Sequence, residues 1–107
     1  MTKVVVEPGI CGFTMQVEAI ADEDQEEITL KVETGCPSIT KMMAPLPATF
    51  DAFELCLNKP GKDPLHAYAS QNFPVHAACP AISGILKCAE AEAGLALKKN
   101  ASITFVE

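Results

Sequence analysis

Residues 11–34 read CGFTMQVEAIADEDQEEITLKVET, and this segment carries the clearest periodic pattern in the chain. Apolar and polar side chains alternate over residues 11–20 and again over residues 27–34. Alternation with a period of two and one polar face is typical of half-buried antiparallel strands. The acidic connection at residues 22–25 lacks the glycine and the distant glutamate of a calcium-binding loop, so we expect a solvated hairpin turn.

The rest of the chain predicts further strands and short helices around this hairpin. A β-branched run at residues 3–6 and the pair Ile103 and Phe105 are each expected to form a strand. Apolar residues at helical spacing, separated by prolines and other breakers, predict helices at 39–43, at 50–57, from Asp63-Pro64 onwards, and from Ile82 to Leu97. The sequence therefore predicts one domain over residues 1–107 with an α+β fold. We expect a small antiparallel sheet, the hairpin plus N- and C-terminal strands, with about four helices packed on one face.

Composition excludes several classes of protein. An apolar fraction of 49% with 21% charged residues rules out general disorder. The formal net charge is −6 and the eight basic residues are scattered, which argues against nucleic acid or an anionic membrane as partner. No apolar run approaches the roughly 20 residues that a bilayer span needs. The run Val4–Val6 is broken at once by Glu7-Pro8-Gly9 and does not resemble a signal peptide, so we expect a cytoplasmic protein.

The five cysteines carry the only chemistry that the sequence suggests. An odd number cannot pair off internally, and a reducing cytoplasm disfavours structural disulfides. The thiols are therefore buried small hydrophobes, metal ligands or reactive groups. Cys56 and Cys88 lie within predicted helices and are expected to pack in the core, and His66 is expected to face solvent.

The hairpin predicts which cysteines meet. A four-residue connection at 22–25 pairs Ala21 with Glu26 and keeps the apolar residues of both strands on one face. In that register Cys11 lies opposite Cys36, with their Cβ atoms about 4.5–5.5 Å apart. The premise is a tight hairpin without a bulge.

Two cysteines stand directly before a proline at the start of a predicted helix, Cys36-Pro37 and Cys79-Pro80. Proline fits the first helical turn and keeps the preceding residue extended, which predicts Cys36 and Cys79 as N-cap residues. A helix N-terminus favours thiolate, the form that binds metal and attacks electrophiles. His76, three residues before Cys79, is a candidate fourth ligand through its neutral imidazole.

The motifs Gly-Ile-Cys-Gly around Cys11, Thr-Gly-Cys-Pro around Cys36 and the later Cys-Pro at Cys79 resemble the TSCPD domain over most of residues 9–92. That small cysteine-containing domain occurs alone and at the ends of some ribonucleotide reductases. The resemblance implies a metal-ligand role for Cys11, Cys36 and Cys79. The family has another cysteine shortly before its last one, where this sequence has residues 71–76.

Three functions are compatible with these residues. The first is a metal-binding module that holds zinc or an iron–sulfur cluster through Cys11, Cys36, Cys79 and one further ligand: His76, Cys56 or Cys88. The second is a thiol-based sulfur carrier or redox protein with Cys79 as nucleophile. The third is a non-catalytic accessory subunit of a partner enzyme, whose cysteines only pack in the core. No phosphate-binding loop, zinc-protease motif, nucleophile elbow or Cys-x-x-Cys pair occurs, which disfavours an enzyme.

Overall fold

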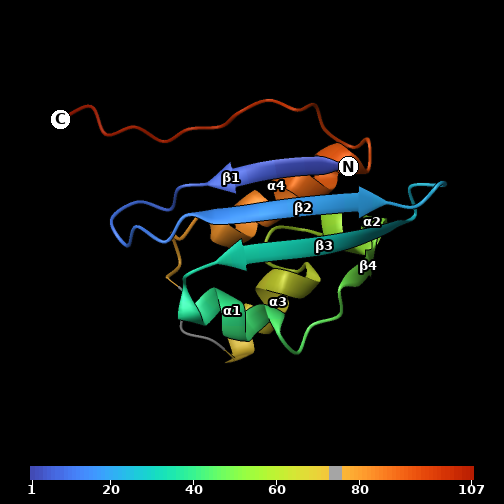
Figure 1. Ribbon diagram of the computed structural model, residues 1–107, viewed down its shortest axis with the longest axis horizontal. Coiled ribbons are helices and arrows are strands. Elements are labelled where there is room, and N and C mark those ends of the chain that lie inside the picture. The colour runs from blue at the N-terminus through green and yellow to red at the C-terminus, as the bar shows by residue number, and fades with distance from the viewer. Residues whose placement is uncertain (73–75) are drawn as a thin grey trace.

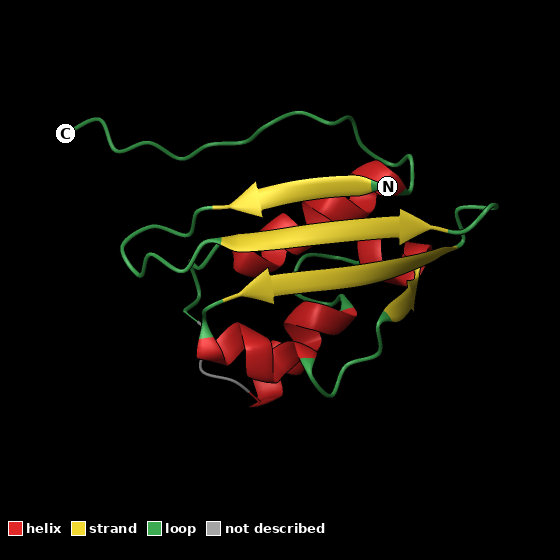
Figure 2. Cartoon of the chain, viewed as in Figure 1, coloured by secondary structure: helices red, strands yellow, loops and turns green. Residues whose placement is uncertain are grey.

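A computed structural model describes residues 1–72 and 76–107, which form a four-stranded antiparallel sheet and four helices (Figure 1). The sheet follows chain order, with β1 (Thr2–Val6), β2 (Met15–Ala21), β3 (Glu27–Thr34) and β4 (Thr49–Asp51) side by side. The helices are α1 (Pro37–Met43), α2 (Ala52–Cys56), α3 (Pro64–Asn72) and α4 (Ala81–Glu92). Figure 2 shows α4 lying behind the strands. The predicted α+β class is confirmed.

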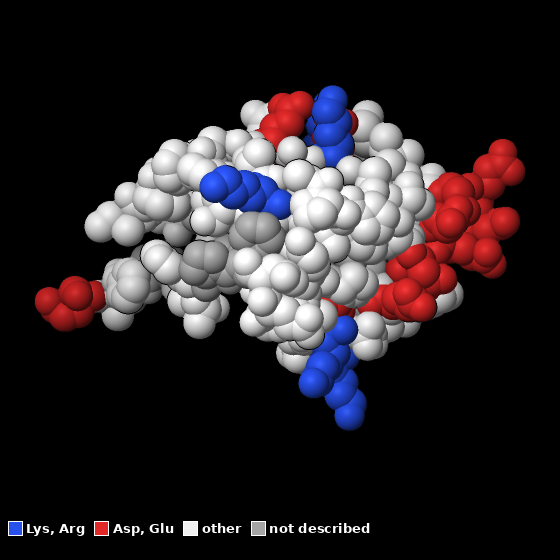
Figure 3. Space-filling view, turned by 90° about the horizontal axis from the view of Figure 1, so that it is seen from below, with Lys and Arg blue, Asp and Glu red and all other residues white. Residues whose placement is uncertain are grey.

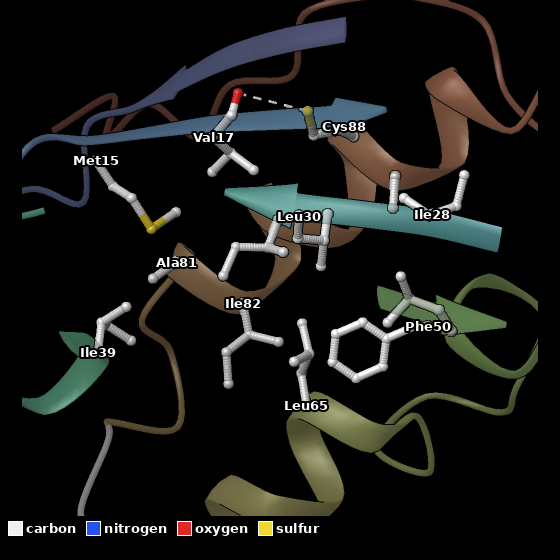
Figure 4. Packing of buried hydrophobic residues seen from close by; sticks show 14 of the residues in the cluster. Met15, Val17, Ile28, Leu30, Ile39, Phe50, Leu65, Ala81, Ile82 and Cys88 are labelled. Atoms are coloured by element: carbon white, nitrogen blue, oxygen red, sulfur yellow. Dashed lines mark hydrogen bonds between the residues drawn. The ribbon is translucent and has the colours of Figure 1, made fainter. Parts of the chain in front are cut away.

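The period-two alternation of the hairpin places one side of each strand in the core. Met15, Val17 and Ala19 of β2 are buried under the helices, while Gln16 and Ile20 point to the exposed face. Figure 4 shows how helix and sheet residues interdigitate there. The buried side chains from outside β2 include Ile28, Leu30, Ile39, Phe50, Leu65, Ile82, Ile85 and Cys88. Burial of this apolar surface is the main favourable term in folding.

The register of the hairpin differs from the predicted one by two residues. Ala21 pairs with Ile28, where the sequence predicted Glu26. The cause is the turn itself: the Asp22 carboxylate accepts hydrogen bonds from the Glu26 and Glu27 amides at 2.9 and 3.3 Å. The Asp22 amide in turn donates to the Glu27 carbonyl at 3.1 Å, so the connection closes one pair later. A shift of two leaves every side chain on its predicted face, because the side-chain period is two.

The segment predicted as one helix over residues 50–57 is a strand followed by a helix. Residues Thr49–Asp51 pair with the start of β3 as β4, which the sequence analysis missed. Asp51 then caps α2, because its carboxylate accepts from the amides of Phe53 and Glu54 at 2.9 and 3.0 Å. Residues Thr49–Asp51 form a strand because β3 lies beside them, and the local sequence pattern does not encode that neighbour.

The predicted closing strand at Ile103 and Phe105 is wrong for the isolated chain. Residues 98–107 form neither strand nor helix and are exposed. Helix α4 also ends at Glu92, before the predicted Leu97. Gly94 has φ +76°, and the amide of Leu95 donates to the carbonyl of Glu90 at 2.9 Å, the glycine-terminated arrangement that ends many helices.

No helix within the described ranges is long and apolar enough to cross a bilayer. Acidic side chains gather at one end of the molecule (Figure 3), the end that carries the β2–β3 turn. Their carboxylates include Asp22, whose role in the turn is structural.

Candidate thiol site

Three of the five cysteines line one small cavity at the end of the sheet where β1 and β3 end and β2 begins. Cys11, Cys36 and Cys79 come from three separate parts of the chain. The cavity has a volume of about 20 Å³, close to the space that one water molecule occupies. The remaining lining is mostly apolar: Val6, Pro8, Phe13, Met15, Thr34, Ile39 and Ala81. We call this space the thiol cavity.

Cys11 lies in the loop between β1 and β2 and is exposed. The predicted strand over 11–20 begins only at Met15, and Met15 pairs with Thr34. The prediction that Cys11 and Cys36 pair across the hairpin is therefore wrong. Both residues line the thiol cavity instead, because the loop that carries Cys11 turns back over the end of the sheet. Gly12, at φ +72°, allows that turn, and its amide donates to the Gly9 carbonyl at 3.0 Å.

Cys36 is the N-cap of α1, as the Cys-Pro motif predicted. Its backbone is extended, with φ −71° and ψ 117°, and its carbonyl accepts the first helical hydrogen bond from the Thr40 amide. The thiol makes no capping hydrogen bond, so the cysteine is not there as a cap. The Thr34 hydroxyl accepts from the Cys36 amide at 3.1 Å and fixes the residue at the cavity.

Cys79 stands one residue before the N-cap of α4, and its predicted place as the N-cap is wrong. The amide of Cys79 donates to the His76 carbonyl at 3.1 Å in a tight turn. Pro80 is the N-cap, with ψ near 2°, and its carbonyl accepts from the Gly84 amide at 2.8 Å. The helix begins one residue later than the motif suggested, because the turn keeps Cys79 outside it. Cys79 is half-buried.

His76, the proposed fourth ligand, is exposed, and its side chain is not part of the cavity lining. Residues 73–75, just before it in the compared stretch 71–76, lie outside the described residues. Among the described residues, no group of three or more His, Cys, Asp or Glu side chains is placed so that it could hold a metal ion. Cys11, Cys36 and Cys79 therefore border one cavity but do not form a three-ligand metal site in this structure.

The other two cysteines, Cys56 and Cys88, lie outside the thiol cavity, and their surroundings favour the protonated thiol. Cys88 of α4 is fully buried, and its thiol donates to the carbonyls of Thr2 and Val17 at 3.2 and 3.6 Å; Figure 4 shows the second of these bonds. Burial raises the pKa of the Cys88 thiol. Burial also raises the pKa of Cys56, to about 11, and the nearby carboxylates of Glu90 and Asp63 add to the effect. The prediction that Cys88 packs in the core is confirmed, whereas Cys56 is only partly buried against the core, as Cys36 and Cys79 are.

An Asp–His pair outside the cavity was not anticipated. His66, expected to face solvent, is only partly exposed, and its Nδ1 lies 2.6 Å from Asp63 Oδ1. The same carboxylate accepts from the amides of Leu65 and His66 at 3.1 Å, so Asp63 caps α3 as predicted. Their spacing of three residues across a helix start is the sequence signal for this contact.

The chain belongs to a family of unknown function, DUF6951, whose model matches residues 2–105. No curated protein and no solved structure matches the chain significantly.

Proposed function

We propose that the chain is a small metal-binding module in which Cys11, Cys36 and Cys79 hold a zinc ion or an iron–sulfur cluster. The observation that carries the proposal is the shared cavity: three thiols distant in sequence line it, whereas Cys56 and Cys88 do not. Packing alone gives no reason for three cysteines to gather around one void, because a closely packed interior normally leaves none there.

Electrostatics favours a cation at this place. Three thiolates around a small and mostly apolar cavity would repel one another strongly, and a divalent metal ion offsets that repulsion. The cavity volume of about 20 Å³ suits one ion better than a cluster of several iron and sulfur atoms, so zinc is the preferred occupant. Zinc takes thiolate ligands at about 2.3 Å in a tetrahedral site.

Closing the site requires the loop that carries Cys11 to move inward. Cys11 is exposed, and Gly9 and Gly12 on either side have positive φ angles. Glycine at such positions leaves a short loop free to adjust its path. His76, in the turn that leads to Cys79, or a water molecule would complete the four ligands. Metal binding would then order the loop and stabilise the chain.

The resemblance to the TSCPD domain supports the same ligand set. Its motifs lie at Cys11, Cys36 and Cys79, and these are the residues that border the thiol cavity. No feature outside the three motifs bears on the metal.

A thiol carrier or redox protein is the second candidate. Cys36 and Cys79 are both half-buried and line the same cavity, as two thiols that exchange with a disulfide or carry sulfur would. In this function Cys79 is the nucleophile, and no metal is bound.

Single Cys→Ser variants separate the two candidates. The protein is purified without oxygen, and bound zinc and iron are measured by elemental analysis together with the absorption spectrum. We expect about one zinc per chain in the native protein and loss of binding in the Cys11, Cys36 and Cys79 variants. Cys56→Ser and Cys88→Ser are the matched controls and should keep the metal. A native protein that stays metal-free when offered either metal, with Cys79 rapidly alkylated at neutral pH, favours the thiol carrier.

A further inference from the structure

The outer edge of β1 has no neighbouring strand within the described part of the chain. The sheet runs β1-β2-β3-β4, so β1 is an edge strand whose outward amides and carbonyls are unpaired in the sheet. Val4 and Val6 on its core side are only partly buried, although α4 packs against this side of the strand at Gly84. A free edge of this kind is a template for another strand.

The C-terminal segment has the composition of a strand and contacts no apolar partner. Ile103 and Phe105 alternate with Ser102 and Thr104, and the two apolar side chains are 90% and 94% exposed. Alternating β-branched and aromatic residues are typical of a half-buried strand. Within the described residues, the outer edge of β1 therefore lacks a neighbouring strand. Residues 102–105 have the composition of a strand but belong to no sheet.

The direction of the segment disfavours pairing with its own β1. The end of α4 is fixed beside the start of β1, since Glu92 Oε1 accepts from the Thr2 hydroxyl at 2.7 Å. From there the C-terminal segment runs in the same direction as β1 (Figure 1). Pairing within one chain would be parallel, in a sheet that is otherwise antiparallel. A second copy related by a two-fold axis perpendicular to β1 presents its β1 in the opposite direction, so an antiparallel pair can form.

Charge points to the same partner. Antiparallel pairing brings Lys98 and Lys99 toward Glu7 of the second copy, and brings Glu107 toward that copy's Lys3 and N-terminal amine. Parallel pairing would reverse these neighbours and place like charges together, which is unfavourable.

We propose that residues 101–106 add as a strand to the free edge of β1 in a second copy of the chain, and that the second copy does the same in return. Ile103 and Phe105 then cover Val4 and Val6 on the helix side of the sheet. The exchange joins two sheets by main-chain hydrogen bonds, as in other cases of strand addition. The two proposals share Val6, which also lines the thiol cavity, but the metal proposal uses none of the residues beyond Ala81.

The test is the oligomeric state of the full chain by sedimentation equilibrium over a range of protein concentrations. We expect a species of twice the chain mass of 11.4 kDa. The double variant Ile103→Asp/Phe105→Asp should raise the dimer Kd by about a hundredfold or more, because two charges would be buried beside β1. Ser102→Asp/Thr104→Asp is the matched control on the opposite face and should remain dimeric. The segment contacts nothing in its own chain, so neither change should alter the folding of the monomer.

Hydrogen exchange locates the contact. Amides of residues 101–106 and of β1 should be protected in the dimer, and both should lose protection in the Ile103→Asp/Phe105→Asp variant. A native protein that is monomeric at all concentrations would overturn the proposal. So would a dimer that both double variants leave intact, since its interface would then lie elsewhere.

Discussion

Helix α4 meets the sheet at both of its ends, beside the thiol cavity at Ala81 and beside the start of β1 at Glu92. At the Glu92 end the carboxylate accepts from the Ala21 amide at 2.9 Å and from the Thr2 hydroxyl, and the N-terminal amine lies 3.4 Å away. At the other end a void and two half-buried thiols take the place of such an anchor. One end of the helix is therefore fixed by polar contacts, while the other borders a small and mostly apolar void.

The largest expected difference between the regions is thiol reactivity. Cys56, with a pKa of about 11 against an ordinary 9.0, holds about a hundredfold less thiolate at neutral pH than an unperturbed cysteine. In metal-free protein at pH 7.5, iodoacetamide should modify the three cavity cysteines first, the exposed Cys11 and the half-buried Cys36 and Cys79. Cys56 and the buried Cys88 should react at least tenfold more slowly, as mass spectrometry of the peptides would show. Equal rates at all sites would remove the distinction between cavity thiols and core thiols.

The next effect concerns how closely α4 approaches β1 near the cavity. A Cβ added at Gly84 would lie 2.2 Å from Cγ2 of Val6, which is a steric clash. Gly84→Ala should therefore destabilise the chain by about 1–3 kcal/mol, measured by urea unfolding. Val6→Ala removes the clashing atoms, so the double variant should be more stable than the sum of the single changes predicts. Simple additivity would show that the helix shifts freely at this end.

The smallest effect concerns the anchored end. Hydrogen bonds from Ala21 and Thr2, and the N-terminal amine, hold the pKa of Glu92 below its ordinary 4.5. Its contribution to stability is therefore present above about pH 4.5 and is lost as the pH falls through the lowered pKa. Glu92→Gln should cost about 1–2 kcal/mol at pH 7, and the cost should shrink as the pH falls below 4.5 through the lowered pKa. The exposed Glu33→Gln is the control and should change stability by less than about 0.5 kcal/mol at either pH.

Local sequence patterns predicted the α+β class, the faces of β2 and β3, and the burial of Cys88. These properties follow from local periodicity, which a register shift of two residues leaves unchanged. The N-cap position of Cys36 also follows from local geometry, because the proline after it restricts the backbone.

Four features depend on contacts between distant parts of the chain: the register, the strand β4, the exposed C-terminal segment and the set of residues that line the thiol cavity. The register depends on where the Asp22 carboxylate closes the turn, a contact that alternation does not encode. A strand exists only beside a neighbour, so Phe50 became a strand residue and Ile103 did not. Cys11 and Cys36 line the same cavity because the β1–β2 loop passes over the end of the sheet. Local sequence patterns do not predict that path.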